Sequence, residues 1–286
     1  ALISPTDPVS VLGVLREENV PASLQSAVAG ESLFNDGVGI VVFTILLGAA
    51  VTGADFSLGE GARLFVIEAG GGVAMGLMIG WLGFRALRSM DEYTLEVLIT
   101  LAVVMGGYAL CSQLHVSGPL AMAVAGLLIG NQGANLAMSD QTLDYVNKFW
   151  ELVDEVLNSV LFLLIGLEVI ALVPGVRELL FGLAAIVITL VARAIAVGGA
   201  IKAIPAARLS TPGSGRVLWW GGLRGGISVA LALSLPAGST RDLLLAATFA
   251  AVLFSVLVQR TTLGKLIDSL KAAHSPVMDG SGRGAD

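Results

Sequence analysis

Two carboxylates and an amide interrupt a segment that is otherwise apolar. Residues 27–51 contain no Lys or Arg and have the composition of a membrane span, yet they include Glu31, Asn35 and Asp36. An acidic side chain at bilayer depth costs roughly 2.5–3.5 kcal/mol on insertion scales, so it is a functional candidate by default. Glu31 and Asn35, four residues apart, share one stripe of a helix, and Ser32 and Asp36 share the next. This clustering predicts a site for a small ion.

Asp36 is the predicted ion-binding carboxylate. Carboxylate oxygens bind hard cations, and they also bind protons. A single carboxylate cannot hold both at once. Competition between the two ions for Asp36 would therefore be an exchange mechanism in itself.

A helix breaker near the start of the chain predicts the second part of this site. Pro8 lacks a backbone N–H and disfavours helical geometry at Asp7, so carbonyl groups near Thr6 should be free to bind a cation. Thr6 would contribute its hydroxyl or its carbonyl. Asp7 has two readings that the sequence leaves open: it is a cation ligand, or it stabilises the N-terminus of a half-helix.

Two arginines lie within apolar segments. Arg193 stays charged and needs a buried partner, for which we favour Glu31, with Asn35 bridging the pair. Glu168 is the competing partner. Arg224 lies in a glycine-rich break at 221–226, where we expect it to meet the exposed carbonyls of that interrupted helix; anion binding is the less favoured reading.

The composition is that of a polytopic membrane protein. The chain is 55% hydrophobic and 13% charged, and its mean hydropathy is +0.86. Several apolar runs reach the roughly 20 residues that a membrane helix needs. No basic footprint for nucleic acid is present, and the single cysteine excludes an internal disulfide. We therefore expect a lipid bilayer as partner, no nucleic acid and no cofactor.

Hydropathy predicts an all-α fold with about eight full or short spans and one partial span. The predicted segments are 1–15, 27–51, 63–87, 94–114, 117–130, 151–172, 176–202, 217–235 and 241–262. Residues 1–264 form the membrane domain, and 265–286 form a short polar tail that we expect to be disordered. Asp91, Glu92 and Glu96 are expected to begin a helix at the surface.

Basic residues indicate the orientation. If the loop after Arg16 is cytoplasmic and the spans alternate, eleven of the sixteen basic residues fall on the cytoplasmic side, three on the opposite side and two inside spans. The cytoplasmic set is Arg16, Arg85, Arg88, Lys148, Lys202, Arg208, Arg216, Arg260, Lys265, Lys271 and Arg283. This asymmetry predicts a cytoplasmic C-terminus. The two breaks, near Pro8 and at 221–226, stand in corresponding positions, as in transporters built from inverted repeats.

The motifs together resemble the NhaP/NHE-type sodium/proton antiporters, the electroneutral branch of the monovalent cation:proton antiporters. The resemblance rests on the Thr6-Asp7-Pro8 break, the 31–36 stretch, Arg193 and the 221–225 break, and it covers most of the chain. It implies a core with two crossing discontinuous helices, a homodimer, and an inner-membrane location. It also implies spans that precede Thr6 in the family, so we expect this chain to lack its N-terminal spans.

The resemblance assigns roles to residues. Asp36 would bind sodium or a proton, with Thr6, Ser32, Asp7 and Glu31 near the ion and Asn35, Arg193 and Arg224 in support. Electrogenic relatives carry an aspartate at the position of Asn35, so electroneutral exchange is implied. The predicted activity is sodium (or lithium)/proton exchange by alternating access. Potassium/proton exchange is the alternative; an intramembrane enzyme and a passive channel are less favoured.

Overall fold

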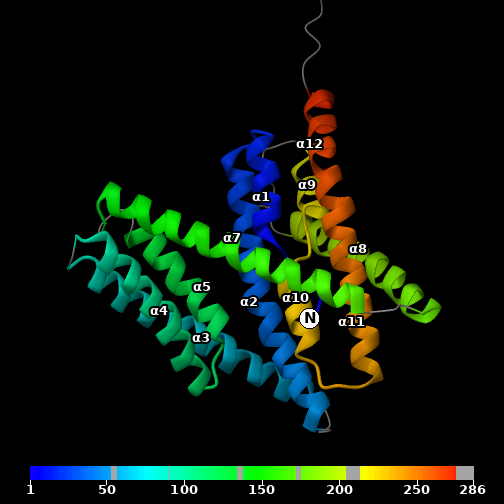
Figure 1. The fold of residues 1–286 in the computed structure, drawn as a ribbon, viewed down its shortest axis with the longest axis horizontal. Helices are drawn as coiled ribbons and strands as arrows, with labels where there is room; N and C mark the ends of the chain where they lie inside the picture. The colour runs from blue at the N-terminus through cyan, green and yellow to red at the C-terminus, as the bar shows by residue number, and fades with distance from the viewer. Residues whose placement is uncertain (53–56, 90, 134–137, 172–174, 204–212, 275–286) are drawn as a thin grey trace, which may run out of the picture.

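The computed structural model describes residues 1–52, 57–89, 91–133, 138–171, 175–203 and 213–274, and every regular element in these ranges is a helix. The described ranges contain thirteen helical elements, and Figure 1 labels most of them. They are α1 (Pro8–Glu17), α2 (Ala22–Thr52), α3 (Leu58–Leu87), α4 (Tyr93–Gln113), α5 (Gly118–Leu128), the π-helical turn η1 (Ile129–Gly133), α7 (Asp140–Ala171), α8 (Val176–Ala203), α9 (Ser214–Trp220), α10 (Gly226–Leu233), α11 (Ser239–Phe254), the π-helical turn η3 (Ser255–Gln259) and α12 (Arg260–His274).

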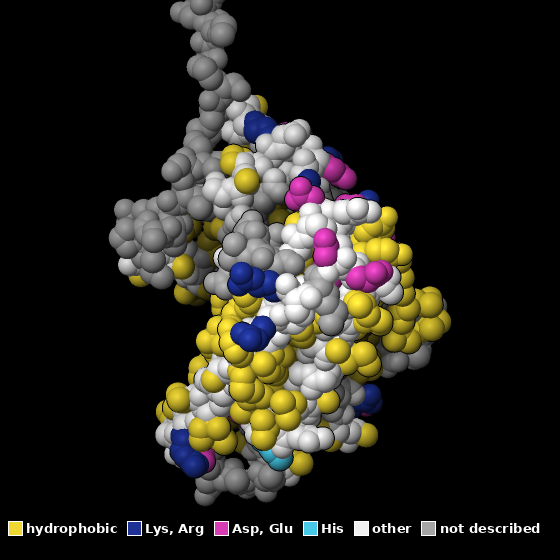
Figure 2. Space-filling view, turned by 90° about the vertical axis from the view of Figure 1, so that its left-hand side faces the viewer, with side chains coloured by type: hydrophobic (Ala, Val, Ile, Leu, Met, Phe, Trp, Pro, Cys, Tyr) yellow, Lys and Arg dark blue, Asp and Glu magenta, His cyan; other side chains and the backbone are white. Residues whose placement is uncertain are grey.

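Five helical segments of the described residues are long and apolar enough to cross a membrane: α2, α3, α4, α8 and the continuous segment from α11 to α12. The remaining predicted spans differ from this simple form. α5 is short, α9 and α10 are two short helices separated by the 221–225 break, and α7 starts at Asp140 instead of 151. Figure 2 shows hydrophobic side chains over much of one face, as expected for a surface that contacts lipid.

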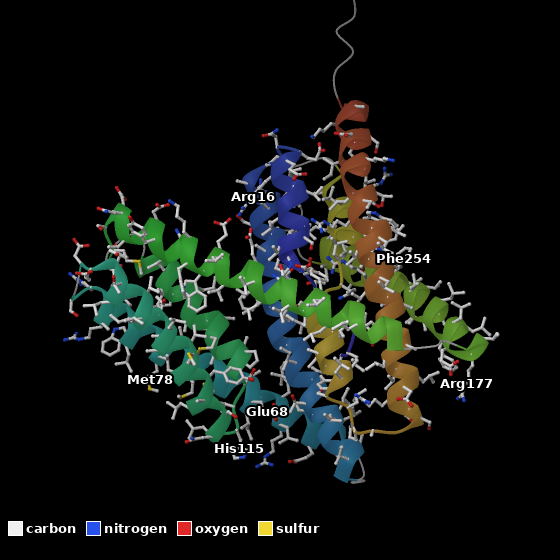
Figure 3. The ribbon with its side chains drawn as sticks, in the orientation of Figure 1. Arg16, Glu68, Met78, His115, Arg177 and Phe254 are labelled. Carbon is white, nitrogen blue, oxygen red and sulfur yellow. The ribbon has the colours of Figure 1, made fainter. Side chains whose placement is uncertain are left out.

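Residues labelled in Figure 3 mark the two ends of the molecule. Arg16 lies at the upper end of the molecule and His115 at the lower end, while Arg177 lies at the lower right, where α8 starts (Figure 3). α7 descends across the front of the molecule from the upper left towards the lower right (Figure 1). The end that carries Arg16 and α12 is therefore the end assigned to the cytoplasm by the basic residues.

A stripe of glycines allows α3 and α5 to pack at close range. A Cβ atom at Gly72 would lie 2.8 Å from the Ser117 carbonyl oxygen, one at Gly80 would lie 2.9 Å from the Ala125 Cα, and one at Gly76 would overlap the Ala121 carbonyl. Small residues at intervals of four are typical of helix packing in membranes. α5 in turn contacts α2, which carries Asp36, so this packing supports the site from one side.

The C-terminal helix extends beyond the predicted boundary at 264. α12 continues through residue 265 to His274, so the prediction of a disordered tail was wrong for this stretch, and 275–286 lie outside the described residues. Leu263 and Ile267 are buried in a cluster with residues of α1, α2 and α9. Lys271 donates to the Glu18 carboxylate at 2.8 Å, which lowers the pKa of Glu18 below its usual value. An amphipathic stripe that packs against α1 thus keeps the segment helical.

The expectation that Glu96 lies at the surface was also wrong. Its side chain is fully buried in the first turn of α4; neither carboxylate oxygen accepts a hydrogen bond of standard geometry from the described residues, and the Thr142 hydroxyl on α7 is a weak polar neighbour. The reason is the N-terminal extension of α7, which packs against α4. Tyr145 stacks on Tyr93 with ring centroids 4.6 Å apart, and the Trp150 indole donates to Thr100 at 3.1 Å.

Candidate ion-binding site

The two breaks contact each other through their backbones. The Asp7 N–H donates to the Leu223 carbonyl at 2.8 Å, and a Cβ atom at Gly225 would lie 2.8 Å from the Asp7 Cβ. The backbone groups freed by each break are thus partly satisfied by the other, as non-helical segments at membrane depth require. The glycine at 225 permits this close approach.

Asp7 caps the N-terminus of α1. Its Oδ1 accepts hydrogen bonds from the backbone N–H groups of Val9 and Ser10, at 3.0 and 3.3 Å, and its Oδ2 accepts one from the Ser10 hydroxyl at 2.6 Å. Pro8 occupies the first helical position, where its missing N–H costs nothing. Of the two readings of Asp7, the geometry matches stabilisation of a half-helix N-terminus.

Asp36 is held against the first break. Its Oδ1 accepts a hydrogen bond from the Thr6 backbone N–H at 2.7 Å, and the Thr6 hydroxyl donates to the Ser32 hydroxyl at 3.1 Å. Thr6 and Ser32 are 3% and 4% exposed, whereas Asp36 is partly buried. The structure therefore brings together three of the residues that the sequence singled out. A carboxylate, two hydroxyls and backbone carbonyls are ligands suited to a hard cation.

Asn35 has a different partner from the one expected. Its amide nitrogen donates to the Ser4 carbonyl at 2.6 Å, and its amide oxygen accepts from the Ser4 hydroxyl at 2.8 Å. It therefore fastens the extended segment before α1 to α2. The prediction that Asn35 bridges Glu31 and Arg193 was wrong, because its two polar atoms are both used by Ser4.

Arg193 forms the predicted pair with Glu31. Its two terminal nitrogens donate to the two carboxylate oxygens at 2.7 and 2.9 Å, and it also donates to the Leu218 and Trp219 carbonyls at the end of α9. Arg193 is 8% exposed. The pair neutralises the charge of Glu31. The side chain of the competing partner, Glu168, lies outside the described residues.

The side chain of Arg224 extends from the break at 221–226 to the break near Pro8. Its guanidinium donates to the carbonyls of Ser4 and Pro5, and its side chain is 7% exposed. The sequence predicted contact with exposed carbonyls, and the carbonyls found are those of the segment before α1. Arg224 thus supplies a positive charge where that backbone is irregular.

Two cavities border these residues. One, of about 810 Å³, is lined by the three predicted supporting residues, Asn35, Arg193 and Arg224, and by Glu31, which was predicted to lie near the ion. The other, of about 190 Å³, is called the site cavity here. It is lined by Pro5, Thr6, Asp7, Pro8, Val9, Asp36, Asp154, Asn158, Leu161, Gly225, Gly226 and Ile227. Ser32 and Glu31 do not line the site cavity; Ser32 reaches it only through Thr6.

Sequence reasoning missed the two polar residues that α7 contributes. Asp154 and Asn158 are four residues apart and lie on one stripe of the helix, facing the site cavity. Their spacing within a mostly apolar stretch was a usable signal. It equals the spacing of Ser32 and Asp36.

Comparison with known proteins agrees with this geometry. Residues 1–268 match the family model described as sodium/hydrogen exchanger, transmembrane. The chain belongs to the sodium/hydrogen exchanger family. It is therefore a multi-pass membrane protein of a transporter family and not an enzyme.

Several curated members of the exchanger family are similar over almost the whole chain. The Na⁺/H⁺ antiporter NhaP of Pseudomonas aeruginosa is 49% identical over 96% of this chain and 66% of its own length. NhaH of Halobacillus dabanensis is 39% identical over 94% of this chain and 67% of its own length. The low-affinity antiporter NhaS1 of Synechocystis is 37% identical, with coverages of 92% and 51%. The chain thus spans about half to two thirds of the length of these relatives.

Proposed function

We propose that the protein exchanges sodium (or lithium) for protons across the cell inner membrane, by alternating access at Asp36. The observation that carries the proposal is the environment of Asp36: one carboxylate that lines a cavity, held to an irregular backbone segment by the Thr6 N–H. A cation and a proton compete for this carboxylate, so binding of one releases the other. Relatives named as Na⁺/H⁺ antiporters support this choice of ions.

Thr6 and Ser32 provide further oxygen ligands for the ion at Asp36. Asp7 and Arg224 stabilise the backbone where the two breaks meet. The two crossed segments would form the centre of an inverted-repeat fold, in which the breaks provide polar groups at the midplane. Glu31 is neutralised by Arg193, which leaves Asp36 as the carboxylate that exchanges its proton. One such group per cycle predicts electroneutral exchange of one cation for one proton.

The protein is further proposed to work as a homodimer, with its C-terminus in the cytoplasm. The basic residues and the shared end of α1 and α12 support this orientation. The test is a sodium-triggered pH change in sealed vesicles that contain the full-length protein. We expect proton movement in the parent and none in Asp36→Asn, with both proteins equally stable. Retained transport in a stable Asp36→Asn variant would refute the assignment.

Potassium/proton exchange is the alternative function, because oxygen ligands do not by themselves separate the two cations. The same vesicles decide between them. A response to potassium without one to sodium would keep the mechanism and change the cation. An added membrane voltage should leave the rate unchanged if exchange is electroneutral.

A further inference from the structure

The polar stripe of α7 faces the proposed site from the opposite wall of the site cavity. Asp154 and Asn158 on α7 line it together with Asp36 on α2 and Thr6 in the segment before α1. Leu161, one turn further along, packs so closely against α10 that a Cβ atom at Gly226 would overlap its side chain. The wall formed by α7 therefore changes from polar to apolar along the helix.

The exposure of these residues falls from Asp154 towards the site. Asp154 is exposed, Asn158 and Asp36 are partly buried, and Thr6 is buried. α7 starts on the side of the molecule where Arg16 lies and descends from there (Figures 1 and 3), and Asp154 precedes Leu161 along this helix. The polar side of the site cavity is thus the side that the basic residues assign to the cytoplasm.

The charged residues that line the site cavity are all acidic and favour cations. Asp7, Asp36 and Asp154 all line it, and none of its lining residues in the described structure is Lys or Arg. The closest basic residue along α7, Lys148, is paired with Asp144 at 2.6 Å. A cleft lined by charges of one sign raises the local concentration of counter-ions. At roughly 30 Å³ per water molecule, the volume of about 190 Å³ accommodates a cation with part of its hydration shell.

We propose that the negative charge of Asp154 attracts cations from the cytoplasmic side. The Asn158 amide oxygen then binds the cation on its way from Asp154 to Asp36. This inference rests on the proposed function and adds two residues to it. Asp154 acts by its charge and therefore sets the apparent affinity for the cation at one face of the membrane. Asn158 acts as a ligand, since its amide carries no charge. Asp36 alone exchanges the proton.

The test is the sodium dependence of exchange in vesicles of known orientation, with the full-length protein. Asp154→Asn should raise the KM for sodium on the cytoplasmic side about fivefold, the effect of removing one charge near the ion in a solvated setting. Its maximal rate and its KM on the opposite side should not change. Added choline chloride should shrink the difference, because salt screens exposed charges. Asp154→Glu should restore the parental KM.

Matched variants separate charge from ligation. Glu155→Gln removes a neighbouring charge that does not line the site cavity, and it should leave the KM unchanged. Asn158→Leu should raise the KM to an extent that does not depend on salt. An unchanged KM in Asp154→Asn, or an equal rise in Glu155→Gln, would overturn this inference while the parental exchange still supports the proposed function. A parent that exchanges no cation for protons would overturn both.

Discussion

The guanidinium of Arg193 binds both carboxylate oxygens of Glu31, at 2.7 and 2.9 Å, and so joins α8 to α2 through two residues that are 162 positions apart in sequence. The same guanidinium donates to two carbonyls at the end of α9. One side chain therefore neutralises a carboxylate and completes a helix terminus. The pair organises the core around Asp36 without itself facing the site cavity.

Arg193→Ala should destabilise the protein by roughly 3 kcal/mol. The change leaves the Glu31 carboxylate without its partner and the α9 carbonyls without their donor, and breaking a buried ion pair costs about 3–5 kcal/mol. Because Glu31 retains 35% exposure of its side chain, the lower end of this range applies. Thermal unfolding in detergent measures the loss. The double variant Arg193→Met with Glu31→Gln should recover part of it, and an unchanged midpoint in Arg193→Ala would contradict the role of the pair.

Gly222→Ala should disturb the ion pair between Arg193 and Glu31 by displacing the arginine. A Cβ atom at Gly222 would overlap the Arg193 guanidinium, so the arginine has to move away from Glu31. We expect a lower unfolding temperature together with impaired exchange. Gly106→Ala is the control, since nothing lies within 4 Å of a Cβ atom there and alanine favours a helix. Equal effects of the two variants would show that the close contact at Gly222 is not the cause.

Asn35→Asp should weaken the attachment of the segment before α1. An aspartate cannot donate to the Ser4 carbonyl, a bond that Asn35 makes at 2.6 Å, so we expect a loss of about 1–3 kcal/mol. If the new carboxylate also exchanges a proton, transport will acquire a dependence on membrane voltage. Unfolding temperature and voltage dependence are measured on the same preparation. Asn35→Asp with parental stability would show that the Ser4 contact is dispensable.

Glu96→Met should stabilise the protein. The Glu96 carboxylate is buried without a hydrogen bond of standard geometry from the described residues, and burial of an unsatisfied polar group costs about 1–3 kcal/mol. Methionine has a similar volume and carries no such penalty. Glu92→Gln, at an exposed position on the same helix end, should change little. A lower unfolding temperature in Glu96→Met would indicate that the carboxylate has a partner or a function of its own.

The sequence predicted those features that burial alone makes necessary. An arginine inside an apolar span requires a counter-ion, and Glu31 was the carboxylate with a suitable position. The prolines and glycines near Pro8 and at 221–226 located both breaks, because few other residues end a helix so reliably. Thr6, Ser32 and Asp36 were brought together as expected.

The remaining features depend on how helices cross in space. Asn35 binds Ser4 because the segment before α1 runs along α2. The hydrophobic periodicity of the sequence does not predict the path of this segment. Asp154 and Asn158 reach the site cavity because α7 lies obliquely across the molecule, and hydropathy carries no information on tilt. α12 stays helical because α1, α2 and α9 offer its apolar stripe a surface. Each of these outcomes is a tertiary contact between distant segments.

Competition between sodium and a proton for Asp36 predicts that sodium binding releases a proton from the protein. Calorimetric titration of the full-length protein, in buffers that differ in ionisation enthalpy, counts the protons released for each sodium bound. At a pH at which Asp36 is protonated in the absence of sodium, one proton should leave Asp36 for each sodium bound, and Asp36→Asn should abolish both binding and release. Sodium binding without proton release in the parent, or undiminished binding in Asp36→Asn, would contradict competition at this carboxylate.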